Sequence, residues 1–423
     1  MTDIENPMLD AAKKRKRILV AVIVSLCVLY VLLAARPLSR EIHFLPVWTI
    51  DADNSTRTER LSIQEMKDNA EKLVSEMNKP ASVEVSETDS ENADSENPEN
   101  PESNAVSQDQ KTSEVDVVSS AKFDGAIPFK LGQLVGYFTK NGRMLSRVTF
   151  PFKASVSPSF YSVYETHSEK IEVHSPDGKK IAEINQTGFP YFADDKIFLF
   201  LPGGASFARI GSTGEVLWTY EGYSPVTAFS SSKEGLLAGF ADGHLISFAP
   251  DGSVVFEFEP GGSTYPVILG AGISNSGKLI AAVSGHDNQR FVLAENKGGR
   301  AKVIFHKTFS REVTGQMVVK FKNDESAVYY GCSDGLGVVN CKSLKSTVVP
   351  LVGTILSIQE DNDGTIFVLS KDGNTYSVSV VEAYDVHSGS FSFEAETAFM
   401  SVRDGSLFVG HDSKISRIDI KHK

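Results

Sequence analysis

The side chains that most often carry out chemistry in proteins are scattered along this 423-residue sequence. No two of its nine histidines have the spacing that places metal ligands on one face of a helix. Two of them, in His286-Asp287 and His411-Asp412, stand in short polar stretches typical of hairpin turns. No Gly-x-Ser-x-Gly, Walker-type or His-Glu-x-x-His motif occurs. The residues therefore predict no catalytic group, no metal site and no cofactor, they mark no binding residue, and they favour a protein that is not an enzyme.

The three cysteines are too few for a disulfide scaffold. Cys27 lies in an apolar N-terminal stretch, so only Cys332 and Cys341 could pair with each other. If Asp334-Gly335 forms a two-residue turn, these two cysteines lie about four residues apart along the hairpin, roughly 13 Å at ~3.3 Å per residue. That distance is too long for a disulfide bond. The sequence therefore favours two unpaired thiols.

The elements that could position a site repeat along the chain. Between about residues 161 and 412, a short apolar stretch runs into a tight polar turn, and a second strand-like stretch leaves it. The turns stand at Ser168, Gly203, Asp242, Asp287, Asp334, Asp372 and Asp412, at spacings of 35, 39, 45, 47, 38 and 40 residues. A period of this size is typical of an all-β propeller, and the seven turns predict seven blades.

Each repeat is predicted to form a small antiparallel sheet. The apolar stretches before the turns, such as 197–201 and 366–369, have the length and the flanking glycines of buried strands. Asp-Gly pairs at several turns supply the positive φ that two-residue hairpins need. A second turn follows about ten residues after the first, at 176–178, 212–214 and 250–252. Each repeat therefore holds three or four strands, and the repeats should pack radially into a ring.

The two ends of the repeat region predict how the ring closes. Only one strand, 415–420, follows the last turn, so the last blade lacks its outermost strand. Before the first repeat stands a hairpin with strands at 134–138 and 144–150 around Asn141-Gly142. One of these strands could complete the last sheet and remove its exposed edge. The other strand is then spare, which leaves eight blades as the alternative.

One repeat resembles a known family. The stretch Thr213-Gly214-Glu215-Val216-Leu217-Trp218 is similar to the Thr-Gly-x-x-x-Trp repeat of pyrroloquinoline-quinone-type (PQQ-like) propellers. That class includes membrane-bound quinoprotein dehydrogenases and non-catalytic outer-membrane assembly factors such as BamB. Residues 250–256 are similar with Phe256 in place of the tryptophan, and Gly410-His411 matches half of a WD40 signature. The resemblance covers the chain from about residue 131 and implies a WD40-like or PQQ-like propeller, but it places no site residue.

The acidic charge is concentrated in one stretch. The formal net charge is −12, and residues 80–120 hold eleven acidic residues against one base, which leaves only −2 for the rest of the chain. A nearly neutral propeller lacks the clustered Lys and Arg of a nucleic-acid-binding surface, so no nucleic acid is expected as a partner. The tract is rich in Ser, Asn, Glu and Pro and cannot bury enough apolar surface to fold. We expect it to be a disordered linker that tethers the propeller.

The N-terminal region predicts a single membrane anchor. Residues 18–35 carry no charge and reach ~27 Å as a helix at ~1.5 Å per residue, just enough to cross a bilayer core. Five bases at 13–17 precede this stretch, which predicts a cytoplasmic N-terminus and a propeller outside the cytoplasm. A cleaved signal peptide is the alternative, although Leu33-Ala34-Ala35 makes a poor cleavage site.

Residues 62–79 predict a short amphipathic helix. Ser62 and Glu65 form a capping box, and apolar residues follow at 3-4-3-4 spacing. Two heptads leave two alternatives open: a helix docked on the propeller or on a membrane neighbour, and self-association through 62–79.

These observations predict a single-pass membrane protein of the bacterial envelope. The predicted parts are a basic cytoplasmic tail (1–17), a transmembrane helix (18–35), a juxtamembrane segment with the short helix (36–79), the acidic linker (80–120) and the propeller (121–423). The expected function is non-enzymatic protein binding or scaffolding, through the propeller loops, in periplasmic protein assembly. The alternatives are a quinoprotein-type oxidoreductase and a ligand sensor that uses the propeller centre.

Overall fold

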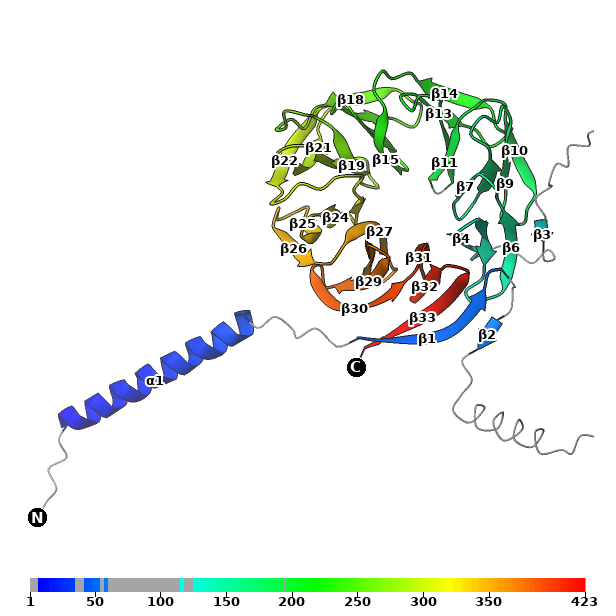
Figure 1. Cartoon of the computed structure of the whole chain (residues 1–423). Helices are drawn as coiled ribbons and strands as arrows, with labels where there is room; N and C mark the ends of the chain where they lie inside the picture. The colour runs from blue at the N-terminus through cyan, green and yellow to red at the C-terminus, as the bar shows by residue number, and fades with distance from the viewer. Residues whose placement is uncertain are drawn as a thin grey trace, which may run out of the picture. The chain divides into compact units, whose positions relative to one another are not determined.

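The computed structural model describes residues 7–34, 42–53, 57–59, 115–117, 125–193 and 195–422. The chain divides into two compact units, Met1–Glu41 and Ile42–Lys423. The first unit contains helix α1 (Pro7–Ala34), and the second contains all the strands. The strands that are described form eight antiparallel sheets, which stand as the blades of a ring (Figure 1). The predicted all-β propeller is confirmed, but the seven-blade prediction is wrong and the eight-blade alternative is right.

Blades two to four are each built from four consecutive strands, which follow one another from the centre of the ring outward (Figure 1). Each strand pairs with the next through a tight turn, so the pairing is local in sequence. Their strands are β7 (Lys153–Val156), β8 (Tyr161–Tyr164), β9 (Ile171–His174) and β10 (Lys180–Ile184); β11 (Phe189–Ala193), β12 (Lys196–Phe200), β13 (Phe207–Ile210) and β14 (Val216–Tyr220); β15 (Val226–Ser232), β16 (Gly235–Phe240), β17 (Leu245–Phe248) and β18 (Val254–Phe258).

Blades five to seven repeat this plan, and the outer strands of blades five and seven are longer. The second strand of each blade is apolar along its length, because it is covered on both faces by the neighbouring blades; β24 and β28 are buried over most of their residues. Their strands are β19 (Ile268–Ile273), β20 (Leu279–Ser284), β21 (Arg290–Asn296) and β22 (Ala301–Thr308); β23 (Val319–Phe321), β24 (Ala327–Cys332), β25 (Gly335–Asn340) and β26 (Ser346–Pro350); β27 (Thr354–Glu360), β28 (Ile366–Asp372), β29 (Thr375–Glu382) and β30 (Val386–Glu394).

Both predicted sets of turns are confirmed. The seven turns of the first set all fall where the second strand of a blade meets the third, in blades two to eight. Gly243, Gly335 and Gly373 in the Asp-Gly pairs have positive φ. The two-residue turns predicted at Asp334-Gly335 and Asp372-Gly373 are each shifted by one residue, because Cys332 pairs with Gly335 and Asp372 pairs with Thr375. The second set, at 176–178, 212–214 and 250–252, joins the third strand of a blade to the fourth. The period read from the sequence is therefore the period of the blades.

The sheet that brings the number of blades to eight is the first blade, and it contains the hairpin around Asn141-Gly142. Its strands are β5 (Leu134–Phe138) and β6 (Met144–Thr149), with β4 (Ile127–Leu131) inside them and β3 (Val115–Val117) outside. The prediction that one of these hairpin strands completes the last sheet is therefore wrong. Both strands belong to the first blade, where β5 pairs with β4 on its inner side and with β6 on its outer side. The sequence pattern did not predict β4 as a strand.

The ring is closed by β1 (Ile42–Asp51), which directly follows α1 in the chain. It pairs antiparallel with β33 (Lys414–His422) over nine residue pairs, from Ile42 opposite His422 to Asp51 opposite Lys414. The last sheet also contains β31 (Ala398–Arg403), β32 (Ser406–His411) and, outside β1, the short β2 (Arg57–Glu59). The segment from residue 36, predicted to lie beside the membrane, thus contributes the outer strand of the last blade.

This closure corrects the expected position of the acidic tract. The chain enters the ring at β1, and residues 80–120 follow later, between β2 and β4. The tract therefore cannot separate the N-terminal helix from the propeller, and the predicted stalk is wrong. Within the tract, β3 pairs with β6 on the first blade. The predicted helix at 62–79 and the rest of the acidic tract lie outside the described residues.

Helix α1 includes most of the predicted transmembrane segment and extends into the predicted basic tail. Its described side chains between Ile18 and Tyr30 are exposed and uncharged. Among the residues that the structure describes, no helix is both long enough and apolar enough to cross a membrane. The membrane span stays a prediction.

Candidate functional site

One side of the ring carries the connections between blades and the turns between the second and third strands of each blade, and we call this side the loop face. In each four-stranded antiparallel blade, the strand ends alternate between the two sides of the ring. The connections between blades and the turns between second and third strands therefore lie together. Hydrogen bonds confirm this, because the amide of Asp242 in such a turn donates to Ser224 Oγ (3.0 Å) in the connection before that blade. The loop face is where side chains can vary without disturbing the ladder.

Aspartates in the turns hold the connections in place. Asp287, between β20 and β21, accepts hydrogen bonds from Ser263 Oγ and from the amides of Thr264 (2.9 Å) and Tyr265 (3.0 Å) in the connection between β18 and β19. The Ser263 hydroxyl, followed by the Tyr265 and Thr264 amides, holds the pKa of Asp287 far below its usual range. Asp412 likewise accepts from the amide of Glu396 (3.0 Å). These contacts make the connections rigid.

The connections nevertheless expose large apolar side chains. Four of them carry one each, and these are Phe152, Tyr223, Tyr265 and Val352. Tyr223 is fully exposed, although its loop is fixed on both sides. The Gly222 amide donates to Ser206 Oγ (3.2 Å), and the Asp242 amide donates to Ser224 Oγ (3.0 Å). An apolar side chain stabilises the fold only when it is removed from water. The exposed ring of Tyr223 therefore contributes nothing to folding. Such residues are typical of binding surfaces.

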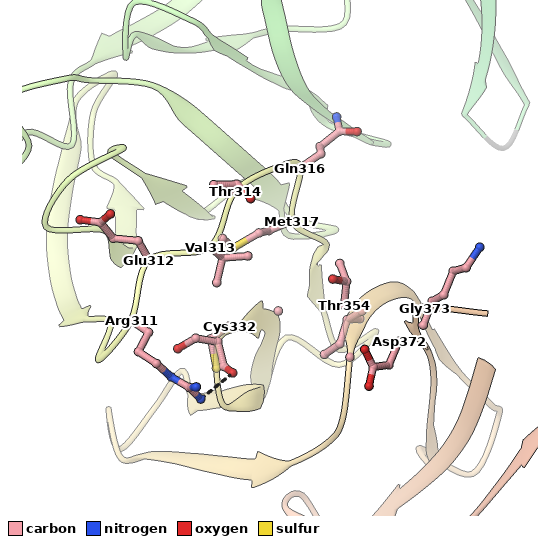
Figure 2. A pocket seen from close by; sticks show the side chains of 15 residues that line it. Arg311, Glu312, Val313, Thr314, Gln316, Met317, Cys332, Thr354, Asp372 and Gly373 are labelled. Atoms are coloured by element: carbon pink, nitrogen blue, oxygen red, sulfur yellow. Dashed lines mark hydrogen bonds between the residues drawn. The ribbon is translucent and has the colours of Figure 1, made fainter. Parts of the chain in front are cut away.

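A cavity of about 460 Å³ opens on the same face, between blades six and seven. Its walls come from the connections before β23 and β27 and from the ends of β24 and β28. Figure 2 shows Val313 and Met317 across from Thr354 and Asp372. Arg311 is fixed at the rim by bonds to Asp334 (2.8 Å) and to the carbonyl of Ser333, the latter drawn as a dashed line. The lining is mainly polar, and its large apolar members are Val313, Met317 and Ile355.

Cys332 lies in the wall of this cavity, and both it and Cys341 are free thiols. The turn that separates their strands is Ser333-Asp334, because Gly335 pairs directly with Cys332, so the predicted two-residue turn at Asp334-Gly335 is shifted by one residue. Burial raises the pKa of both thiols, that of Cys341 to about 12. Neutral thiols of this kind are poor nucleophiles.

A second hollow, of about 390 Å³, lies along the innermost strands β15, β19, β23 and β27. It shares Gln316, Met317 and Ile355 with the first cavity, so the two adjoin. Its lining includes Phe229, and Leu356 is exposed toward it. Within the described ranges, no group of three or more His, Cys, Asp or Glu side chains is arranged to hold a metal ion.

The sequence predictions for single residues have clear outcomes here. His286-Asp287 and His411-Asp412 do lie at turns, where Asp287 and Asp412 brace the connections as predicted turn residues. The exposed apolar residues of the loop face were missed. Their signal was an aromatic residue inside a Gly/Ser/Pro-rich stretch, as in Glu221-Gly222-Tyr223-Ser224-Pro225, where burial in a strand is excluded.

Comparison with known proteins covers almost the whole chain. A family model described as a beta-propeller protein matches residues 8–86 and 83–423. An uncharacterized protein from Treponema pallidum (strain Nichols) is 31% identical over 295 residues, which is 69% of this chain and 78% of that protein. The crystal structure of BamB from Moraxella catarrhalis aligns with a TM-score of 0.49 and 13% identity, over 72% of this chain and 99% of that one. At that score, the likeness to BamB carries no argument about function.

Proposed function

Because this chain belongs to the β-propeller protein family, we propose that it is a non-enzymatic protein-binding scaffold of the bacterial envelope. In this proposal α1 anchors the chain in a membrane, and the ring lies outside the cytoplasm. The loop face holds the partner. The Thr213-to-Trp218 stretch resembles the repeat of PQQ-like propellers, a class that includes both membrane-bound quinoprotein dehydrogenases and non-catalytic outer-membrane assembly factors, and both of these fit an envelope location.

The observation that carries the proposal is the set of exposed apolar residues on braced connections. Phe152, Tyr223, Tyr265 and Val352 come from four different connections but lie on one side of the ring. The connections of Tyr223 and Tyr265 are braced by surface hydrogen bonds to serine and aspartate side chains, and such bracing would not be needed to present side chains that have no partner. A protein that binds such a surface loses little conformational entropy from it, because the loops are already ordered.

The anchor proposal is supported by the described part of α1. Its apolar residues from Ile18 to Tyr30 are exposed on all sides, and the exposed bases Arg15 and Lys16 precede them. Protease treatment of right-side-out vesicles tests the topology. Loss of the ring is the expected result, and full protection of the ring would reverse the orientation.

The alternative is a quinoprotein-type oxidoreductase or a ligand sensor that uses the centre of the ring. The hollow along the innermost strands supports this alternative, because it offers space at the centre of the ring and the ring of Phe229 in its wall offers a surface for stacking. The hollow also adjoins the larger cavity. Mass spectrometry of the purified full-length chain decides the matter. A bound quinone or other stoichiometric small molecule would support the alternative.

Site-specific photo-crosslinking in cells tests the scaffold. A photoreactive residue at Val352, on a loop-face connection, should crosslink to envelope proteins. The same residue at Val254 is the matched control, since this exposed valine begins β18 at the opposite end of the blade. Equal crosslinking from both positions, or none from Val352 at any protein level, would reject the loop face as the binding surface.

A further inference from the structure

Two of the exposed side chains belong to one acidic surface on the fourth blade. Tyr223 lies on the connection that enters this blade, and Tyr265 lies on the connection that leaves it. The carboxylates of Asp242, Glu257 and Glu259 lie at the same end of the blade, where Pro266, next to Tyr265, lies against Gly243. We call the two tyrosines and these three carboxylates the tyrosine patch.

The patch is contiguous. The imidazole of His244 contacts all three carboxylates, at 3.2 Å to Asp242, 3.4 Å to Glu257 and 3.0 Å to Glu259. Asp242 is tied to the connection of Tyr223 through Ser224. Glu259 begins the connection that carries Tyr265.

Tyr265 is held by its own backbone and Tyr223 by its two neighbours, Gly222 and Ser224, and both rings are exposed. The amide of Tyr265 donates to Asp287, and its carbonyl accepts from the amide of His286 (3.0 Å). The same connection is braced by Arg290, which donates to the carbonyl of Pro260. Among the described residues, neither tyrosine ring packs against another aromatic ring, and neither phenol has a hydrogen-bond partner. The rings are therefore presented to solvent on a rigid base.

The charge around the rings is negative. Glu221 adds a fourth exposed carboxylate beside Tyr223. These four carboxylates outnumber the guanidinium of Arg290, which braces the connection of Tyr265 by donating to the Pro260 carbonyl and whose Nε has no hydrogen-bond partner among the described residues. The face of a tyrosine ring attracts a cation, and guanidinium groups stack on it readily. Carboxylates near such rings add a second attraction for the same cation.

We propose that the tyrosine patch binds an arginine- or lysine-bearing segment of a protein partner, with the cations placed between the tyrosine rings and the carboxylates. This rests on the proposed function, since it names the chemistry of the partner that the loop face holds. An acidic segment would be repelled, and a purely apolar one would leave the carboxylates desolvated without partners.

The test measures peptide binding to the full-length chain by fluorescence anisotropy at low salt. The probes are labelled ten-residue peptides that alternate serine with arginine, lysine or glutamate. The arginine peptide should bind, the lysine peptide should bind less tightly, and the glutamate peptide should not bind. Tyr223→Ser with Tyr265→Ser should weaken arginine-peptide binding about five- to tenfold. Glu257→Gln with Glu259→Gln should weaken it about two- to fivefold and lower its salt dependence.

The control separates the patch from the acidic tract at 80–120, which also attracts basic peptides. Phe152→Ser with Val352→Ser removes the two other exposed apolar residues of the loop face and leaves the tract and the net charge unchanged. This variant should bind the arginine peptide like the wild type. Equal binding by the tyrosine variant, or no binding by the wild type, overturns the proposal.

The proposal and the scaffold function can fail separately. In cells, a photoreactive residue at position 223 should crosslink to a partner segment that contains arginine or lysine. If the crosslinked segment is acidic or uncharged, or belongs to a second copy of this chain, the basic-segment proposal falls. Crosslinking from Val352 could still succeed in that case, and the scaffold function would then stand without the tyrosine patch.

Discussion

The two tryptophans of this chain make the same contact at two joints of the ring, but the chain reaches the joints differently. Trp218, on β14, donates its indole N–H to the carbonyl of Pro250 in the next blade (3.1 Å), and Gly252 lies under its ring. Trp48, on β1, donates to the carbonyl of Lys140 in the next blade (3.3 Å), and Gly142 lies under its ring. One joint lies inside a continuous run of blades, and the other closes the circle.

The difference lies in burial. Trp48 is 2% exposed and packs with Phe138 and Phe408 from the two blades it joins. Trp218 is only half-buried. At the inner joint, the chain itself continues from β14 to β15, so the blades stay together if the contact weakens. At the closing joint, the ladder between β1 and β33 and the packing of Trp48 against the first blade hold the ring together.

The largest expected effect is therefore that of Trp48→Ala. Removal of a fully buried tryptophan costs about 3–5 kcal/mol, because it removes apolar burial and leaves a cavity between two blades. Trp218→Ala should cost about half as much, because its ring is only half-buried. Thermal unfolding followed by circular dichroism measures both. Hydrogen exchange of the β33 amides should rise in the Trp48 variant alone.

Equal melting temperatures for the two variants would contradict this account of the closing joint. So would faster exchange spread evenly over all eight blades in the Trp48 variant, since that result would mean global unfolding rather than an open seam.

The glycines under the two rings sharpen the comparison. A Cβ at Gly142 would lie 2.9 Å from the Trp48 ring and one at Gly252 would lie 2.5 Å from the Trp218 ring, and both residues have positive φ. An alanine at either position suffers the left-handed backbone strain of about 1–2 kcal/mol. The half-buried Trp218 can move aside and the enclosed Trp48 cannot. Gly142→Ala should therefore lower the melting temperature more than Gly252→Ala, and the reverse order would show that the 2.5 Å contact decides.

The first half of β1 gives a smaller effect at the same seam. Phe44 packs on Phe391 of the preceding blade, with ring centroids 4.8 Å apart, and Ile42 lies against Gly389. Phe44→Ala should cost about 1–2 kcal/mol, since the ring is only partly buried. Leu45→Ala is the control, because Leu45 points to the other side of β1 and is exposed. A Leu45 effect as large as that of Phe44 would exclude packing on β30 as the cause.

The closing strand also shows where sequence-based prediction reached its limit. The repeats were readable because the pairing within each blade is local and its turns recur at a fixed period. The partner of β1 lies more than 360 residues away, and no period points to it. Its strand-forming run, Val47-Trp48-Thr49-Ile50, was present but was assigned to a juxtamembrane segment because it follows α1. Pro46, which argues against a regular strand, sits at the bulge in the ladder.

The loop face was predictable in kind but not in detail. The sequence predicted where the turns stand and that propeller loops would hold a partner, and the Asp residues of the turns were correctly interpreted as turn chemistry. The joining of Tyr223 and Tyr265 into one patch was not predictable, because it depends on how two connections 40 residues apart are braced by different turns. The sequence pattern of the turns does not show which connection a turn aspartate will bind through hydrogen bonds.

The smallest expected effect concerns that bracing and depends on pH. The pKa of Asp287 is lowered in the folded chain by the Ser263 hydroxyl and the amides of Tyr265 and Thr264. A carboxylate with a lowered pKa stabilises the fold above its unfolded pKa, and this contribution is lost as pH falls from that value toward the folded pKa. Exchange at Thr264 and Tyr265 should therefore stay slow at neutral pH and rise only under strongly acidic conditions, below about pH 4.

Asp287→Asn provides the control at neutral pH. An asparagine keeps one acceptor oxygen but loses the charge, so the two amides should exchange faster than in the wild type and show no acid-induced step. The amide of Gly222, which is bound to the Ser206 hydroxyl rather than to a carboxylate, should show no such step in either protein. If Gly222 responds to acid as Tyr265 does, the loss of bracing is not due to Asp287. In that case the connections beside Tyr223 and Tyr265 open together, and the rigidity of the tyrosine patch depends on the blade rather than on its turns.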